Sequence, residues 1–257
     1  MAMTPDLART LPKWPHFSDD ERAVADRVLG SGRVNYWTGT EGREFEREFA
    51  SRFARRHGVA LANGTVALEL ALMAFGVGSG DEVVVTPRSF VASASCAVSV
   101  GARPVFADVD RDSQNLTAET IAAAITPRTK AVIAVHLAGW PCDMPAILQV
   151  TRPQGIAVIE DCAQSPGATI DGRPAGAFGD AAAFSFCQDK IMTTAGEGGM
   201  LLIDDDVRWA WAWSYKDHGK SYEKMNTPAQ GTGFRWVHDR FGTNWRLSEV
   251  QSSDRVG

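Results

Sequence analysis

The sequence predicts an α/β fold in which helices flank a mainly parallel β-sheet. Short apolar runs alternate with helical segments from residue 59 onward, which is the pattern of repeated strand–helix–strand units. The strand-like runs are largely apolar throughout, as in parallel strands that are buried on both faces. The chain has 257 residues, of which 44% are hydrophobic and 22% charged, and this is enough for one large α/β domain.

A short amphipathic helix over 22–29 is the first element that the sequence predicts. Ser18 and Glu21 form a capping-box pattern ahead of it, and Gly30 is a suitable stop. We therefore expect the folded part of the chain to begin with this helix.

Three phenylalanines indicate a second helix. Phe45, Phe49 and Phe53 recur every four residues in an otherwise charged stretch, so they form one apolar stripe along a helix that ends near Gly58. Nothing polar converges on this stripe, and we interpret it as core packing.

The remaining strands and helices follow in alternation. Short apolar runs bounded by turn residues predict strands over 83–86, 104–109, 131–136, 156–160, 181–186 and 198–203. Segments of helical character lie between them and ahead of them, over 66–75, 89–100, 118–125 and 144–150. Gly80, Gly101 and Pro127 mark connections between these elements.

The pattern leaves the structure of two later segments open. The tryptophans of 209–213 alternate, and they can pack from a strand or from several faces of a helix. Packing or burial in an interface explains them better than a ligand platform does. Segment 219–233 contains a proline and several Gly, Ser and Thr residues, so we predict an irregular loop whose role the sequence does not specify.

The charge balance argues against two classes of partner. Lys and Arg number 26 against 31 Asp and Glu, which gives a net charge of −5 and no electrostatic reason to bind nucleic acid or an anionic membrane. The amino terminus lacks a long apolar core, and no run approaches a membrane-spanning length. A cytoplasmic location is the resulting expectation.

The cysteines indicate neither a metal centre nor a disulfide framework. They are widely spaced and form no CxxC pair, so we expect buried, reduced thiols and no metal site. The four residues are Cys96, Cys142, Cys162 and Cys187.

A lysine and an aspartate at the predicted sheet edge point to a cofactor. Asp161 follows the strand over 156–160, and Lys190 lies in the turn after the strand over 181–186. Both should approach one crevice, because ligands of open α/β sheets bind outside the carboxyl ends of the strands. Pyridoxal 5'-phosphate (PLP) needs a lysine amine, a carboxylate for its ring nitrogen and backbone donors for its phosphate. Lys190 and Asp161 meet the first two needs.

The third need can be met at a predicted helix start. Asn63, Gly64 and Thr65 precede a strongly helical run, so free backbone amides and a hydroxyl would form an anion site there. The same residues also suit a simple cap and turn. Ser185 ends another strand and could add a phosphate contact, or it could bond to local backbone.

Three further residues have both a functional and a structural interpretation. Phe90 could lie flat on a pyridine ring or pack in the core. Gln164 could donate its amide to the phenolic oxygen of the cofactor if its loop turns back towards the ring. His136 ends a strand at the same edge, and a structural, hydrogen-bonded role is slightly favoured over contact with a ligand.

Five segments, in order, resemble the DegT/StrS family of PLP-dependent sugar aminotransferases. They are NGTVAL at 63–68, GDEVVVTP at 80–87 with SFVA at 89–92, EDCAQ at 160–164, SFCQDKIMTTAGEGG at 185–199 and GTNWRLSEVQ at 242–251. The resemblance runs from about residue 17 to the last residue. It implies the fold-type-I aminotransferase architecture, with a sheet of seven-stranded type in the large domain.

The resemblance implies a role for each candidate residue. Lys190 resembles the Schiff-base lysine, and Asp161 resembles the partner of the pyridinium nitrogen. Gln164 would contact the phenolic oxygen, and Phe90 would stack on the ring.

The remaining roles that the resemblance implies concern the phosphate. Gly64, Thr65 and Ser185 would hold it. Asn244 corresponds to an asparagine that the family contributes to the phosphate of the neighbouring subunit's cofactor, which implies a homodimer with shared active sites.

Two positions depart from the family pattern without removing a catalytic group. Ala195 lengthens the run between Lys190 and the GEGG motif at 196–199, and Ala138 stands where an aromatic residue is common.

The resemblance also suggests how the chain is divided. We expect an N-terminal tail over 1–16, a PLP-binding large domain over 17–247 and, over 248–257, the start of a helix that leads to a C-terminal small domain. In the family this small domain helps to shape the substrate pocket and the dimer, and we expect it to be missing here.

The activity implied by the resemblance is a ping-pong amino transfer. An amino acid, with glutamate as the expected donor, would give its amino group to a keto group of a nucleotide-linked sugar. A sugar dehydratase of the same family is one alternative, but its lysine is replaced by histidine and Lys190 argues against it. A noncatalytic truncated remnant is another. The sugar, its keto position, the nucleotide and the product stereochemistry stay open, as does a cyclitol or aromatic-ring precursor.

Overall fold

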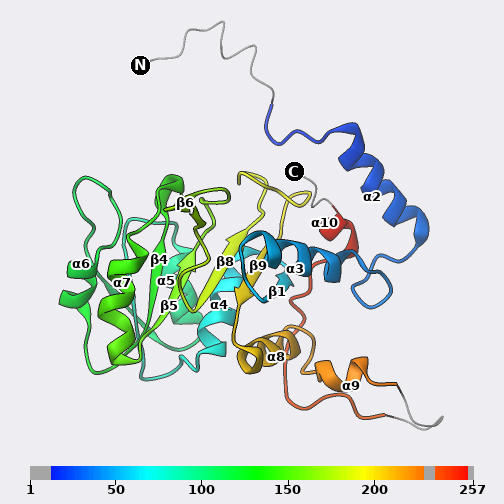
Figure 1. Ribbon diagram of the computed structural model, residues 1–257. Coiled ribbons are helices and arrows are strands. Elements are labelled where there is room, and N and C mark those ends of the chain that lie inside the picture. Colours follow the sequence, from blue (N-terminus) through cyan, green and yellow to red (C-terminus); the bar gives the residue numbers. More distant parts are fainter. Residues whose placement is uncertain (1–12, 229–234, 254–257) are drawn as a thin grey trace, which may run out of the picture.

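A seven-stranded β-sheet forms the centre of the structure (Figure 1). The computed structural model describes residues 13–228 and 235–253. The strand order in the sheet is β1-β9-β8-β5-β4-β2-β3. The strands are β1 His57–Leu61, β2 Glu82–Val85, β3 Arg103–Phe106, β4 Thr129–Val135, β5 Ala157–Asp161, β8 Ala181–Ser185 and β9 Gly199–Ile203.

The sheet is mainly parallel, as the sequence predicts. Strand β9 pairs antiparallel with both of its neighbours, β1 and β8, whereas every other neighbouring pair in the sheet is parallel. The strands β4, β5 and β8 therefore end at one edge. A small antiparallel hairpin of β6 (Thr169–Ile170) and β7 (Arg173–Pro174) connects β5 to β8.

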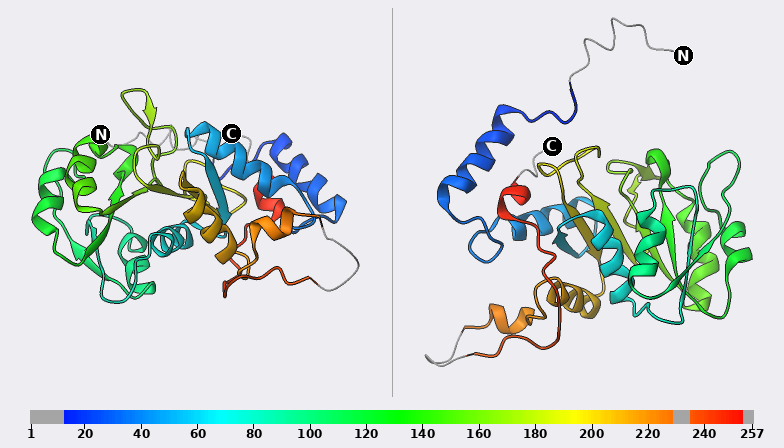
Figure 2. Two further views of the ribbon diagram at one scale, coloured as in Figure 1. Left: turned by 60° about the horizontal axis from the view of Figure 1, so that its bottom comes forward. Right: turned by 180° about the vertical axis from the view of Figure 1, so that it is seen from behind.

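Helices cover both faces of the sheet (Figure 2). Along the described chain they are α2 Asp19–Ser31, α3 Glu41–Arg52, α4 Gly64–Ala74, α5 Ala92–Ser99, α6 Ala118–Ala124, α7 Met144–Thr151, α8 Asp206–Tyr215, α9 Tyr222–Asn226 and α10 Glu249–Ser253, with short 3-10 turns at Leu137–Gly139 and Arg152–Gln154. Among the residues that the structure describes, no helix has the length and apolar character needed to cross a membrane.

Alternate strand residues supply the two faces of the core. Val83 and Val85 of β2 belong to the cluster that packs under α4, α5 and α8, whereas Val84 belongs to the cluster under α6 and α7. The aromatic stripe of α3 packs on the latter side of the sheet, where Phe49 lies 4.9 Å from Phe184 of β8 between ring centroids. The core-packing interpretation of this stripe is confirmed. These contacts pack α3 against β8.

The first two helices differ from the prediction at their ends. Helix α3 ends at Arg52, and Gly58 lies inside β1 rather than at the end of the helix. A side-chain Cβ at Gly58 would lie 2.6 Å from the carbonyl oxygen of Glu46, so the glycine allows α3 to lie against β1. Helix α2 continues past the predicted stop to Ser31, and Gly32 ends it with a φ of 69° in the left-handed region.

The segments left open by the sequence are helical in part. The tryptophans of 209–213 lie on α8, where Trp213 is buried. The segment predicted as an irregular loop over 219–233 contains the short helix α9, and 229–233 lie outside the described residues. The predicted helix start over 248–257 corresponds to α10, whereas 254–257 and the first twelve residues of the predicted tail lie outside the described residues.

Candidate active site

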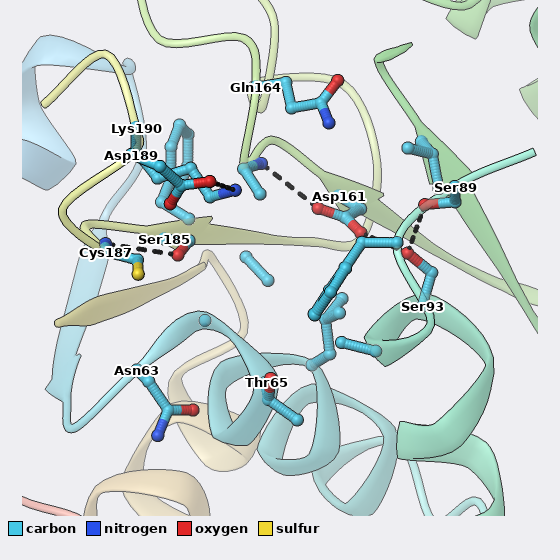
Figure 3. Close-up of a pocket in the computed structure, with 18 of the residues that line it drawn as sticks. Asn63, Thr65, Ser89, Ser93, Asp161, Gln164, Ser185, Cys187, Asp189 and Lys190 are labelled. Carbon is cyan, nitrogen blue, oxygen red and sulfur yellow. Dashed lines mark hydrogen bonds and ion pairs between the residues drawn. The ribbon is translucent and has the colours of Figure 1, made fainter. Parts of the chain in front are cut away.

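A cavity of about 610 Å³ opens at the carboxyl ends of β5 and β8 (Figure 3). The first turn of α4 lies along one side, and the segment that leads into α5 lies along another. The turn after β8 completes the wall. Seven of the predicted site residues line this cavity, namely Gly64, Thr65, Phe90, Asp161, Gln164, Ser185 and Lys190. The strand order therefore brings together residues that are far apart in the sequence.

Asp161 is a buried carboxylate at the cavity wall. The Ser93 hydroxyl donates to its Oδ2 at 2.8 Å, and the Ala163 N–H donates to its Oδ1 at 3.2 Å. Burial raises the pKa of Asp161, and these two donors act in the opposite direction. Within the described residues, no basic side chain forms an ion pair with this carboxylate. A positively charged ring nitrogen of a ligand would complete its environment.

Glu160 points to the opposite face of β5 and has a structural role. Its carboxylate accepts hydrogen bonds from the N–H groups of Gly176, Phe178 and Gly179 at 2.6–2.7 Å. Burial alone would raise the pKa of Glu160, but the hydrogen bond with His136, together with these donors, lowers it below its ordinary value. The residue therefore stays ionised and fixes the loop that follows β7.

His136 belongs to this structural network and does not line the cavity. Its Nδ1 accepts from the Cys142 N–H at 3.1 Å, which places the ring proton on Nε2, and Nε2 lies 2.9 Å from Glu160 Oε2. The His136 backbone N–H also donates to the Asp161 carbonyl at 3.1 Å. The structural interpretation that the sequence slightly favoured agrees with these contacts.

Cys162 lies beside this histidine and glutamate. The three residues His136, Glu160 and Cys162 place potential metal-ligand atoms within 4.8 Å of one another. The histidine and glutamate atoms already make the hydrogen bonds described above, and burial raises the pKa of the Cys162 thiol well above its ordinary value. Because the thiolate is the form that binds metal, we assign this cluster a structural role.

Lys190 extends towards the cavity from the turn after β8. Its side chain is 19% exposed, and its Nζ lies 3.3 Å from Asp189 Oδ2. The backbone N–H of Lys190 donates to the Cys187 carbonyl at 2.9 Å, which closes the turn. The amine is therefore accessible from the cavity that Asp161 also lines.

The first turn of α4 lines the cavity opposite these residues. The Asn63 side chain caps the helix by accepting from the Val66 N–H at 3.0 Å, and the first backbone amides of a helix lack partners within it. A Cβ at Gly64 would lie 2.6 Å from Ser185 Cβ, so only a glycine allows the helix start to approach the end of β8. Gly64, Thr65 and Ser185 thus line one cavity, and their contact with a phosphate stays a prediction.

Phe90, Gln164 and Asn244 occupy different positions relative to the cavity. Phe90 is 68% exposed at its rim. Gln164 Oε1 accepts from the Ala138 N–H at 2.6 Å, which assigns the amide NH₂ as the donor that remains for a ligand. Asn244 is exposed in a bridge with Asp217 and does not line the cavity of its own chain. Its contact with a neighbouring subunit stays a prediction.

Several cavity residues were not predicted from the sequence. Ser89, Ser93, Cys187, Asp189 and Glu197 all line the cavity. The two serines had a weak local signal, because residues four apart near the start of a helix lie on one side of it. Their relation to Asp161 required the fold.

Comparison with known proteins decides the family. A sequence model of the DegT/DnrJ/EryC1/StrS aminotransferase family matches residues 15–254. The chain belongs to this family. This family member is 49% identical over 251 residues to GDP-perosamine synthase of Caulobacter vibrioides, with 96% of this chain and 64% of that protein covered. It is 42% identical over 234 residues to a UDP-N-acetyl-3-dehydro-α-D-glucosamine 3-aminotransferase of Acidithiobacillus ferrooxidans, covering 89% of this chain and 60% of that protein.

A solved structure supports the fold assignment. The family member superimposes on the aminotransferase from Psychrobacter cryohalolentis with a TM-score of 0.93 and 51% sequence identity, covering 95% of this chain and 62% of that one. The α/β aminotransferase fold expected from the sequence is therefore confirmed. The chain spans about three fifths of the length of these relatives.

Proposed function

We propose that this chain forms the PLP-binding core of an enzyme that moves an amino group from an amino acid to a keto group of a nucleotide-linked sugar. Glutamate is the proposed donor. One observation carries the proposal: Lys190 and the buried carboxylate of Asp161 line the same cavity as the start of α4. This combination of amine, carboxylate and backbone donors matches the needs of PLP.

The residues of the cavity fit PLP by their chemistry. The lysine amine suits the aldehyde, the buried carboxylate suits the ring nitrogen, and the Gly64 and Ser185 contact leaves room for a phosphate at the helix start. Gln164 would donate its NH₂ to the phenolic oxygen, and Phe90 would cover one face of the ring. When bound, PLP supplies an electron sink for negative charge on the amine-bearing carbon.

Lys190 and Asp161 would have distinct tasks in the transfer. Lys190 would hold the aldehyde carbon, leave it when the donor amine arrives, and then carry a proton to and from the reacting carbon atoms. Asp161 would keep the ring nitrogen protonated. We therefore expect loss of Asp161 to impair proton removal more than capture of the cofactor.

The substrate class is proposed from the relatives. GDP-perosamine synthase and the UDP-linked aminotransferase carry names that include an activated sugar or its product, and both match most of this chain. Lys190 opposes the dehydratase alternative, because that chemistry replaces the lysine. We further propose a homodimer in which Asn244 serves the partner's phosphate site, and the cytoplasmic location stays a prediction.

Covalent trapping tests the proposal. The purified chain should give a yellow absorbance band with PLP, and borohydride reduction followed by peptide mapping should place the cofactor on Lys190. Lys190→Ala should lose both signals. Lys220→Ala is a matched control, because Lys220 has the same 19% exposed side chain and lies outside the cavity.

The donor is tested on the same sample. Adding glutamate should bleach the yellow band as the amino group passes to the cofactor. An unchanged adduct in Lys190→Ala would refute the lysine assignment, whereas a band that glutamate fails to bleach would refute glutamate as donor.

A further inference from the structure

A chain of two serine hydroxyls leads to Asp161 (Figure 3). Ser89 Oγ lies 2.7 Å from Ser93 Oγ, which lies 2.8 Å from Asp161 Oδ2. An ionised carboxylate only accepts hydrogen bonds, so the Ser93 hydroxyl must donate its single O–H to Asp161. Ser93 must then accept a hydrogen bond from Ser89. We call this chain of two hydrogen bonds, donated from Ser89 to Ser93 and from Ser93 to Asp161, the serine relay.

The serine relay is buried where it meets Asp161, so its hydrogen bond to the carboxylate is strong. Ser93 is 1% exposed, and Asp161 is 6% exposed. Hydrogen bonds are stronger in such surroundings and polarise one another along a chain of donors. The Ala163 N–H at 3.2 Å is the other donor to Asp161, so Ser93 makes the shorter of its two described hydrogen bonds.

We propose that Ser93 is a positioning residue that holds Asp161 ionised and aimed at the ring nitrogen of PLP, with Ser89 polarising it. This inference rests on the proposed function and deepens it. Ser93 would act through Asp161, to which it donates a direct hydrogen bond. Its loss would leave the carboxylate with one hydrogen-bond donor in a buried site, where the neutral acid is favoured.

The other groups around Asp161 do not replace this contact. His136 donates its ring N–H to Glu160, and Lys190 Nζ lies near Asp189. The thiols of Cys96 and Cys162 are the remaining titratable groups near Asp161, and burial raises the pKa of both, that of Cys96 to about 12, so neither adds a charge near neutral pH.

The proposal is tested by comparing PLP with an analogue that lacks the ring nitrogen. Equilibrium binding of PLP is compared with binding of a carbocyclic analogue in which CH replaces the ring nitrogen. Ser93→Ala should weaken PLP on the order of tenfold, since a hydrogen bond to a charged group is lost. It should leave the analogue unchanged within about twofold, because the analogue cannot pair with Asp161. Ser95→Ala, a half-buried serine of the same helix outside the cavity, should change neither.

Ser89→Ala gives a second measurement in a segment outside the helix. It should weaken PLP less than Ser93→Ala does and again spare the analogue, because it removes only the polarising donor. If both variants lose the same affinity for PLP and for the analogue, the serines have a merely structural role and the inference is overturned. Unchanged PLP affinity in Ser93→Ala would also overturn it. In both of these outcomes the wild type still binds PLP at Lys190. A wild type that cannot be trapped with PLP would overturn the proposed function and this inference together.

Discussion

Asp161 combines a proposed chemical role with a cost to stability. Its carboxylate is buried without a basic partner among the described residues, and burial raises its pKa. The pKa in the folded chain therefore exceeds that in the unfolded chain. The stability linked to this group is fully present below the unfolded pKa and is lost as the pH rises through the folded pKa.

Replacing this carboxylate should stabilise the chain without cofactor. Asp161→Asn removes a buried charge and keeps an oxygen to accept from Ser93, so the free energy of unfolding at pH 8 should rise by on the order of 1 kcal/mol. The gain should shrink towards pH 4, which urea unfolding at several pH values would measure. The control Asp112→Asn, on an exposed side chain, should stay within about 0.5 kcal/mol of wild type. A variant less stable than wild type at pH 8 would contradict the prediction.

Strand β5 shows how an element separates two carboxylates. Successive residues of a strand point to opposite faces, so Glu160 and Asp161 have different surroundings. Glu160 receives three backbone N–H groups and His136, whereas Asp161 faces the cavity. One carboxylate fixes the loop after β7, and the other remains available for a cofactor.

The close approach of α4 to β8 is a second property of the elements, and Gly64 permits it because it has no side chain. Gly64→Ala would place a Cβ 2.6 Å from Ser185 Cβ and 3.1 Å from Ser185 Cα, and backbone cannot give way cheaply. We expect a loss of roughly 1–3 kcal/mol in the free energy of unfolding, together with weaker PLP binding.

The control for Gly64→Ala is Gly78→Ala, at a glycine with space around it. At Gly78 the nearest atom to an added Cβ is the Val100 carbonyl oxygen at 3.8 Å, so Gly78→Ala should leave PLP affinity unchanged. Urea unfolding and PLP titration of both variants measure the two effects. Equal behaviour of the two would show that the approach of α4 to β8 does not limit the site.

At the scale of the whole molecule, the proposed shared active site is open to a complementation test. If Asn244 serves the partner's site, mixed dimers of Lys190→Ala and Asn244→Ala chains contain one site with both residues intact and one with neither. Each variant alone should trap little PLP at low concentration. Random pairing of equal amounts should restore about a quarter of the wild-type sites. Borohydride trapping of tagged, mixed dimers measures the number of intact sites. If no sites are recovered, Asn244 serves either the site of its own chain or no site.

The fold was predicted well where local patterns decide structure. The apolar runs around β2, β4, β5 and β8 and the stripe of Phe45 and Phe49 became strands and a helix as expected. Strand β1 was missed because Gly58 was taken as a helix end, although its role is to let α3 lie close. The spacing of side chains along one element is a local property, so the sequence contains it.

The candidate site was likewise predicted only in the part that local patterns decide. Asp161 and Lys190 were predicted because both follow strands, and the carboxyl ends of parallel strands share an edge. Ser93 was missed because its partner Asp161 lies 68 residues further along the chain.

The sequence by itself determined most of the elements, the family and the candidate residues for PLP chemistry. The tertiary structure alone decided which hydroxyl meets which carboxylate, because the strand order β8-β5-β4-β2 sets the distances between residues that no local spacing relates.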